Sequence, residues 1–451
     1  MARTDILLSA RLSACLSLAL LIPAAALAQD HSVEKAQIAQ PSGVLLAQTG
    51  WTSGLNDISA ARLKFEYCAG RVQKTERAAT LARELFGCDT AAEFSDPAEF
   101  YARSKDRIIL VDVTEAIPRL KTLSVEAVSF FREPANYALK SEEDLKREPI
   151  THMIMTGTTA ITRGTGMSAD VHGPGVLSEK IRAYFQTAQY IHISNEVSFT
   201  DACAFQAGLR FCSKQAHFQA FKDLRVNVVE LTGNHNRDFG AEPFLATLNW
   251  FHKNGIRTFG GGRDEANAKS PIFLDLDGSG AISIVGFNEL CPLGECATGP
   301  KPGANRFQIA KARGTIEEIK RQRPDAFIIA TVQFGESSSY QPTLSQRSIS
   351  RALLDAGADL VFGSQAHQVQ QMEFYNGKVI LYGLGNFFFD QIHAPGVRQG
   401  YFMNLYFSQS RLIAMEPVFT WIDEKRRPVL ATEQQAAQIR KSIYADALLY
   451  K

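Results

Sequence analysis

The chain lacks several features that would each indicate a particular class of protein. Its 48 lysine and arginine residues are nearly balanced by 47 aspartate and glutamate residues, so the formal net charge is only +1. This balance argues against a protein that binds nucleic acid or another polyanion through its net charge. Any anionic ligand must instead be held by a local group of charged or polar side chains. The sequence also has no internal repeat, no low-complexity tract and, beyond its first 28 residues, no apolar run that approaches a membrane span.

The first 28 residues have the pattern of a secretion signal. Arg3 and Arg11 form a positively charged start, Leu12–Ile22 is an apolar core, and Ala26–Ala28 has the small residues of a cleavage site. The apolar core is too short for a comfortable membrane span. We therefore expect residues 1–28 to be a cleaved signal peptide and the mature protein to be soluble in the periplasm or outside the cell.

Cysteine is scarce and forms no CxxC pair. Cys15 falls within the predicted signal, and an even number remains. In an exported chain this number favours disulfides, and proximity along the chain favours three local loops. The rival interpretation is a thiolate metal site, which the missing CxxC spacing and the oxidising compartment both weaken. The favoured pairs are Cys68–Cys88, Cys203–Cys212 and Cys291–Cys296.

At 451 residues the chain is long enough for two or three domains. Residues 29–150 carry no chemical motif and are interpreted as a small accessory α/β domain. Residues 151–408 alternate regularly between strand-like and helix-like runs, and residues 409–451 add strands and a helix. Alternation combined with hairpin turns predicts a layered α/β sandwich with mixed sheets. The predicted strands are His152–Met155, Tyr190–Ile193, Val226–Leu231, Ile282–Phe287, Ala326–Val332, Leu360–Phe362 and Val379–Tyr382.

The most informative motif is LTGNHNRDFG, which places Asn234 and His235 in a glycine-flanked turn. An apolar strand precedes the turn and a predicted helix, Ala241–Asn254, follows it. Open α/β sheets present binding and catalytic groups at the carboxyl ends of their strands. Other polar residues follow other predicted strands in the same way. The full set of candidate residues is Thr158, Arg163, Asn195, Glu196, Asn234, His235, Gln333, Ser364, Gln365, His367 and Asn386.

In this order the motifs resemble the CapA family of poly-γ-glutamate capsule biosynthesis proteins, which have the calcineurin-like metallophosphatase fold. The resemblance covers about Thr151–Gln391 and implies a four-layer αββα sandwich. The matching elements are Gly157–Arg163, Glu196, the N-H-x-x-D-x-G motif at Asn234–Gly240, the Pro342-x-x-x-Gln346 spacing, Ala356–Asp359 and the LGNFFFD run at Leu384–Asp390.

Three departures from the family pattern concern its metal ligands. Thr158 stands where the family has a metal-binding aspartate, and Gln333 and Gln365 stand where it has histidines. A two-metal centre needs carboxylates to offset the repulsion between its ions, and glutamine is a poorer ligand than histidine for zinc-like ions. The resemblance therefore makes a dinuclear site doubtful.

The resemblance leaves two cofactor states open, one weakly bound divalent ion (Mn, Zn or Mg) or no ion. The ligands of a single ion would be Glu196, Asn234 and His367, with Gln333 and Gln365 beside them. The remaining acid–base groups are His235, the expected proton donor, and His367, because histidine can exchange protons near neutral pH.

Five residues are predicted to contact substrate, and some of them have structural interpretations as well. Arg163 can hold a carboxylate or phosphate in a bidentate manner, or can form an ion pair with Glu196 or Asp238. Asp238 itself is expected to cap the helix that begins near Ala241. Asn386 can bond backbone turns instead of ligand. The predicted substrate-binding set is Thr158, Arg163, Asn195, Ser364 and Asn386.

Together these features predict an exported CapA-like protein that hydrolyses or transfers an amide or phosphoester bond of an anionic cell-surface polymer. The alternatives are a non-catalytic binding protein with a degenerate metallophosphatase pocket and an assembly factor for capsule export. The expected ligands are an anionic polymer or a small phosphate or carboxylate compound, and the expected partners are capsule-assembly proteins at the membrane. No nucleic-acid partner is expected.

Overall fold

The computed structural model describes residues 43–90, 93–94, 96–104, 107–141, 149–205, 208–276 and 280–444. The predicted signal peptide, residues 1–28, lies outside the described residues. Within the described part of the chain, none of the helices combines the length and apolar character that a membrane crossing requires.

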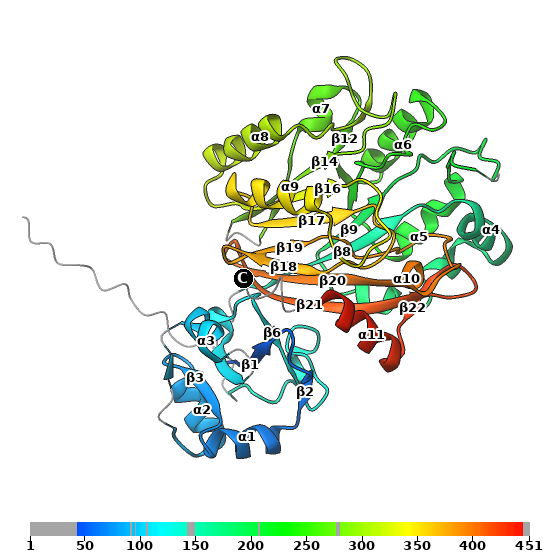
Figure 1. Cartoon of the computed structure of the whole chain (residues 1–451). Coiled ribbons are helices and arrows are strands. Elements are labelled where there is room, and N and C mark those ends of the chain that lie inside the picture. The colour runs from blue at the N-terminus through cyan, green and yellow to red at the C-terminus, as the bar shows by residue number, and fades with distance from the viewer. Residues whose placement is uncertain are drawn as a thin grey trace, which may run out of the picture. The chain divides into compact units, whose positions relative to one another are not determined.

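A small α/β unit precedes the main body of the chain (Figure 1). Its five-stranded sheet has the order β4-β3-β5-β1-β6, and the short strands β2 and β7 pair beside it. Leu46 and Leu110 from this sheet pack with Leu63 and Phe86 from the helices in one core. The elements are β1 (Leu45–Gly50), β2 (Asp57–Ile58), α1 (Ala60–Cys68), β3 (Val72–Thr75), α2 (Ala79–Phe86), β4 (Glu93–Phe94), α3 (Pro97–Ser104), β5 (Ile108–Asp112), β6 (Leu120–Thr122) and β7 (Ser124–Val125).

The first large sheet has seven strands in the order β11-β10-β9-β8-β20-β21-β22. Strands β8 to β11 run parallel to one another, whereas β20 pairs antiparallel with both β8 and β21. The strands are β8 (Thr151–Thr159), β9 (Tyr190–Asn195), β10 (Val228–Glu230), β11 (Arg257–Phe259), β20 (Gln399–Ser408), β21 (Arg411–Ile422) and β22 (Pro428–Leu430).

The second large sheet has six strands in the order β13-β14-β16-β17-β19-β18. Strands β14, β16, β17 and β19 are parallel, and β13 and β18 close the two edges in antiparallel orientation. The strands are β13 (Ile272–Asp275), β14 (Ala281–Asn288), β16 (Phe327–Gln333), β17 (Leu360–Ser364), β18 (Met372–Tyr375) and β19 (Lys378–Leu381).

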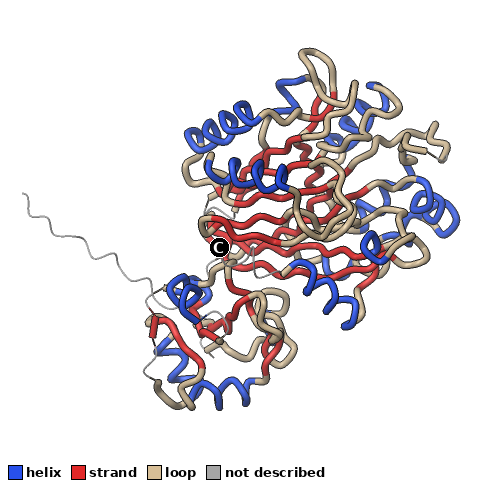
Figure 2. The backbone as a smooth tube through the Cα atoms, viewed as in Figure 1, coloured by secondary structure: helices blue, strands red, loops and turns tan. Residues whose placement is uncertain are grey.

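The two large sheets pack face to face, and helices cover their outer faces (Figures 1 and 2). Met153 and Leu405 of one sheet share a buried core with Ile284 and Ile329 of the other. Separate cores fill the space beneath the helices on each side. The predicted four-layer αββα sandwich with mixed sheets is therefore confirmed. The covering helices are α4 (Arg163–His172), α5 (Phe218–Asp223) and α6 (Ala241–Lys253) on the seven-stranded sheet, and α8 (Ile309–Gln322) and α9 (Leu344–Asp355) on the six-stranded sheet.

All seven strands that were predicted between residues 152 and 382 are present. The three predicted disulfides, Cys68–Cys88, Cys203–Cys212 and Cys291–Cys296, are present as well. The remaining described strands and α-helices of this part are short: β12 (Gly261–Gly262), α7 (Glu265–Lys269), β15 (Gly303–Ala304) and α10 (Pro395–Arg398). A final helix, α11 (Glu433–Ile443), follows β22.

Two glycines allow the chain to cross itself closely at the strand ends. A side chain at Gly157 would overlap the carbonyl oxygen of Gly385, and one at Gly233 would overlap the Cα atom of Glu196. The first contact seats the LGNF segment against β8, where Thr158 bridges Asn386. Only glycine fits such approaches. The two crossings therefore bring segments that are distant in sequence to the carboxyl ends of the parallel strands.

Candidate functional site

Four candidate residues from both large sheets meet around the side-chain amide of Gln333, at the end of β16. Its Nε2 atom lies 2.8 Å from Glu196 Oε1, 2.9 Å from Asn234 Oδ1 and 2.5 Å from Gln365 Oε1. All four residues are buried. One amide nitrogen thus lies among three side-chain oxygen atoms, and the residues that carry them come shortly after strands β9, β10 and β17.

The orientation of this amide is set by Asn288, which the sequence analysis did not single out. Asn288 Nδ2 donates to Gln333 Oε1 at 2.9 Å and also to the carbonyl oxygen of Thr232. Its own Oδ1 accepts from the backbone N–H of Cys291. Because a donor faces the oxygen of Gln333, the nitrogen must point toward Glu196 and its neighbours. The only sequence signal was that Asn288 directly follows the predicted strand Ile282–Phe287, and the observed strand β14 includes it.

This donor set does not fit a two-metal centre. A cation would need the oxygens of Glu196, Asn234 and Gln365 as ligands, but the two amide protons of Gln333 Nε2 already face these three oxygens within hydrogen-bond distance. Among the described residues, no group of three or more histidine, cysteine, aspartate or glutamate side chains could hold a metal ion. The single weakly bound ion on Glu196, Asn234 and His367 stays a prediction.

Glu196 is the one carboxylate of this cluster, and it is only 1 % exposed. Burial raises the pKa of Glu196 to about 7, against the opposing effects of the His235 charge and the Gln333 hydrogen bond. Within the described part of the chain, its Oε2 atom is buried without a hydrogen-bond partner. A buried, unsatisfied oxygen of this kind costs stability, and such groups concentrate where ligands bind.

His235 forms a hydrogen-bonded pair with Asp238. His235 Nδ1 lies 2.8 Å from Asp238 Oδ2, and that same oxygen accepts from the backbone N–H of Phe211 at 2.7 Å. Burial acts to lower the pKa of His235, but the bond to Asp238 and the charge of Glu196 outweigh it and raise the pKa above 6.5. The pair therefore fixes the orientation of the ring and favours its protonated form.

The prediction that Asp238 caps the following helix is wrong. The N-cap of α6 is Gly240, and no side chain caps this end. The carboxylate of Asp238 is already used by His235 and Phe211. The aspartate thus belongs to the candidate site.

His367 lies on a strained loop after β17. Gln365 and His367 have φ angles of 85° and 53°, the left-handed region that non-glycine residues rarely adopt. His367 Nδ1 lies 2.9 Å from Asn386 Oδ1, and burial lowers the pKa of this ring. Asn386 Nδ2 also donates to the carbonyl oxygen of Val397, so Asn386 bonds both a candidate histidine and backbone. Strain of this kind is frequent at functional sites.

Arg163 has a partner other than the two predicted ones. Its guanidinium forms a bidentate ion pair with Asp390, with Nη2–Oδ1 at 2.6 Å and Nε–Oδ2 at 3.1 Å. It also lies over the ring of Phe211, 4.4 Å from the centroid. Neither Glu196 nor Asp238 pairs with it. Because Asp390 already occupies the fork of the guanidinium, a ligand would have to compete for it.

The remaining predicted substrate contacts lie at the same strand ends. Thr158 Oγ1 accepts from the backbone N–H of Gln365 at 3.5 Å, and Asn195 Nδ2 donates to the carbonyl oxygen of Val197 at 2.7 Å. Among the described residues, Asn195 Oδ1 and Ser364 Oγ are buried without a partner. These two atoms can therefore accept a hydrogen bond or, in the case of Ser364, donate one.

Two disulfide-closed loops bring further groups to His235. Phe211, next to Cys212, packs its ring 4.2 Å from the ring of His235. Glu295, next to Cys296, accepts the backbone N–H of Arg237 at 3.0 and 3.1 Å. Glu295 is 4 % exposed, and burial raises its pKa to about 7. Sequence reasoning missed both residues because nothing local relates these loops to the His235 turn.

The fold and the site together define a metallophosphatase-type α/β sandwich in which amides occupy the centre of the strand-end cluster. Residues 152–391, more than half of the chain, match the family model described as "Bacterial capsule synthesis protein PGA_cap". The chain therefore belongs to this family.

Three relatives show how far the similarity extends. The capsule biosynthesis protein CapA of Bacillus anthracis is 24% identical over 287 residues, which are 62% of this chain and 68% of that protein. The PGA biosynthesis protein CapA of Bacillus subtilis is 27% identical over 49% of this chain and 58% of its own length. A probable polyglutamine synthesis accessory protein of Mycobacterium tuberculosis is 26% identical over 37% of this chain and 46% of its own length.

Proposed function

We propose that this chain acts in the synthesis of poly-γ-glutamate or a related anionic capsule polymer, as a hydrolase or transferase that uses His235 for proton exchange. Membership of the capsule synthesis family and the names of the two Bacillus relatives support the pathway. The pair formed by His235 and Asp238 is the observation that supports the chemistry. Three disulfides support a periplasmic or extracellular location.

The proposed reaction needs no metal ion. With Nδ1 held by Asp238, the Nε2 atom of His235 is the ring nitrogen that can exchange a proton with substrate. For a γ-glutamyl amide, water adds to the carbonyl carbon while the neutral form of His235 accepts a proton from the water at Nε2. His235 then donates that proton to the departing nitrogen, so a carboxylate and an amine are released. Asp238 orients the ring and stabilises its charged form.

The test is to incubate the purified chain with poly-γ-glutamate and to measure newly formed amino ends. His235→Gln should lower the rate at least about 100-fold, and Asp238→Asn should lower it by less, because general acid–base catalysis contributes about 10²–10⁴-fold. His252→Gln, on the outer helix α6, is the matched control and should retain the rate. Equal rates for wild type and His235→Gln would exclude this role for His235.

A second candidate is a non-catalytic protein that binds the polymer and works with capsule-assembly proteins at the membrane. The observation in its favour is the cluster around Gln333, in which the amide groups already bond one another. In this case wild type releases no amino ends but binds the polymer in calorimetry, and His235→Gln retains the affinity. Release of amino ends by wild type would reject this candidate.

A further inference from the structure

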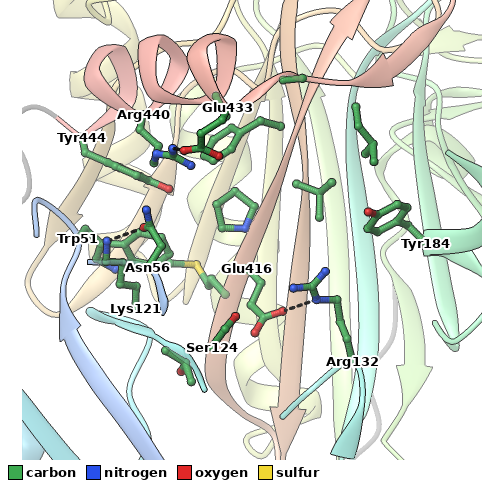
Figure 3. Close-up of a pocket in the computed structure, with 18 residues that line it drawn as sticks. Trp51, Asn56, Lys121, Ser124, Arg132, Tyr184, Glu416, Glu433, Arg440 and Tyr444 are labelled. Carbon is green, nitrogen blue, oxygen red and sulfur yellow. Dashed lines mark hydrogen bonds and ion pairs between the residues drawn. The ribbon is translucent and has the colours of Figure 1, made fainter. Parts of the chain in front are cut away.

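A polar cavity lies away from the strand ends, between the N-terminal unit, the middle of β21 and helix α11 (Figure 3). Its volume is about 310 Å³, which is at the lower end of the range of ligand pockets. None of the candidate residues of the strand-end site lines it. The residues that matter for its chemistry are Trp51, Lys121, Arg132, Glu416, Phe419, Glu433, Arg440 and Tyr444.

Lys121 brings a buried positive charge to this cavity. It is only 7 % exposed, and its ammonium donates to the carbonyl oxygen of Ser53 at 2.6 Å and to Asn56 Oδ1 at 2.9 Å. Both acceptors are neutral, and no carboxylate of the described residues pairs with it. An ammonium has three protons to donate, so this group can form one further bond. A buried cation without a counter-charge is energetically costly.

Arg440 brings a second cation to the cavity. Its guanidinium lies over the ring of Phe419, 5.4 Å from the centroid, and pairs with Glu433. The Glu433 side chain is 85% exposed, so solvent and salt screen this pair. Burial and then the charge of Arg440 lower the pKa of Lys121 to about 8. The two cations are therefore close enough to repel each other.

The other charges of the cavity are balanced. Arg132 Nε lies 3.5 Å from Glu416 Oε2 (Figure 3). Glu416 Oε1 accepts from Ser129 Oγ at 2.6 Å. Arg132 is thus neutralised by Glu416, and Arg440 is neutralised by Glu433. Lys121 remains as one excess positive charge. A ligand with one negative charge would balance the cavity.

Aromatic side chains form an apolar wall beside Lys121. The rings of Trp51 and Tyr444 lie 5.2 Å apart, and Trp51 Nε1 donates to the carbonyl oxygen of Pro118. Since its N–H is already bonded, Trp51 offers the cavity apolar ring surface. We propose that this cavity binds a small molecule with one carboxylate on an apolar or planar body. The carboxylate lies between Lys121 and Arg440, and the body lies against the aromatic wall.

Two sources could supply such a carboxylate, a free small acid or the end of a γ-glutamyl chain. The probes are therefore phenylacetate and tri-γ-glutamate, with inorganic phosphate as a third ligand, each titrated into the full chain by calorimetry. We expect saturable binding of at least one carboxylate. Phenylacetate binding identifies a free acid as the source, and binding of tri-γ-glutamate alone identifies a chain end.

Lys121→Met and Arg440→Gln should each weaken binding of that carboxylate at least about tenfold, because each removes a charged hydrogen-bond donor. Lys301→Met removes an exposed lysine elsewhere and should leave the affinity unchanged. Glu433→Gln should tighten binding several-fold, because it frees Arg440 for the ligand. A folding defect would not produce tighter binding, so this variant keeps the test valid if Lys121→Met fails to fold.

The proposal is overturned if neither carboxylate binds saturably at millimolar concentration, or if phosphate alone binds. It is also overturned if Lys121→Met and Arg440→Gln, both folded, bind as wild type does. The activity of His235 plays no part in these measurements, so the proposal stands or falls apart from the proposed function.

Discussion

The strand-end cluster and the cavity beside α11 are both polar and buried, but they differ in how their groups are satisfied. In the cluster, the two amide protons of Gln333 are shared among three neighbouring oxygens, and Asn288 donates to the oxygen of the same amide. In the cavity, Lys121 faces neutral acceptors and a second cation, Arg440. The amides at the centre of the cluster are therefore bonded without a ligand, although no described residue bonds Glu196 Oε2, whereas the excess charge of the cavity is balanced only by a ligand.

The largest effect that we predict is on the cluster. Gln333→Leu removes the donor to Glu196 and leaves a buried carboxylate unpaired, so the free energy of unfolding should fall by about 3 kcal/mol. Urea titration measures it, and Gln434→Leu, an exposed glutamine on α11, is the control with no expected change. Lys121→Met should lower the free energy of unfolding much less, since it removes a buried charge that no described carboxylate balances. Equal losses of unfolding free energy in Gln333→Leu and Lys121→Met would contradict the difference between the two sites.

The second prediction converts the cluster into an ion site. In the triple variant Thr158→Asp, Gln333→His and Gln365→His, an amide donor is replaced by ligands typical of divalent metals. Affinity for Mn²⁺ or Zn²⁺ should rise about 100-fold over wild type, because carboxylate and imidazole are far better ligands than hydroxyl and amide. Elemental analysis and calorimetry measure this change. If the triple variant binds no more metal than wild type or Gln365→His alone, our alignment of these positions with the family motifs is incorrect.

The third prediction concerns His152, a buried ring that neither site uses. Its Nε2 lies 2.9 Å from Asn404 Oδ1, yet burial lowers the pKa of His152 to about 4. The unfolded ring has the higher pKa of 6.5, so the stabilising contribution is complete above pH 6.5 and is lost as the pH falls toward 4. Between pH 8 and pH 5 the loss should be about 2 kcal/mol. Urea titrations at both pH values should show a smaller loss of unfolding free energy in His152→Gln than in wild type. An equal loss in the two proteins would contradict the role of His152 in this pH dependence.

The smallest effect is expected for Arg163. Its ion pair with Asp390 is partly buried, so Arg163→Gln should lower the free energy of unfolding by about 1 kcal/mol. Because Asp390 holds the guanidinium, polymer affinity should change less than about threefold. Thermal unfolding and calorimetry give the two values. A large loss of affinity with little loss of stability would mean that Arg163 leaves Asp390 to bind ligand.

Sequence reasoning predicted those features that depend on local patterns. The strands before Asn234 and Gln333 were found because apolar runs end in polar turns, and side chains of an α/β fold that follow strand ends are expected at the site. Asn234 follows β10 of one large sheet and Gln333 ends β16 of the other, and the two residues meet where the sheets face each other. The disulfides were found because each closes a short loop. Contacts between distant segments could not be derived in this way. The pairing of Arg163 with Asp390, and the orientation of Gln333 by Asn288, depend on packing that no short motif encodes.

The cavity was missed for the same reason. Its lining residues range from Trp51 to Tyr444 and belong to separate elements. Lys121 is part of a short stretch with no recognisable motif, and its significance depends on the finding that no carboxylate of the described residues forms an ion pair with it. An unbalanced charge is a property of the folded arrangement, so it becomes visible only when all neighbours are placed.

The two disulfide loops beside His235 have a consequence for the order in which the protein matures. Phe211 and Glu295 reach the turn that carries His235 from loops closed by Cys203–Cys212 and Cys291–Cys296. Each of these loops is closed only when its two cysteines are oxidised. The surroundings of His235 would then be completed only when these two disulfides have formed.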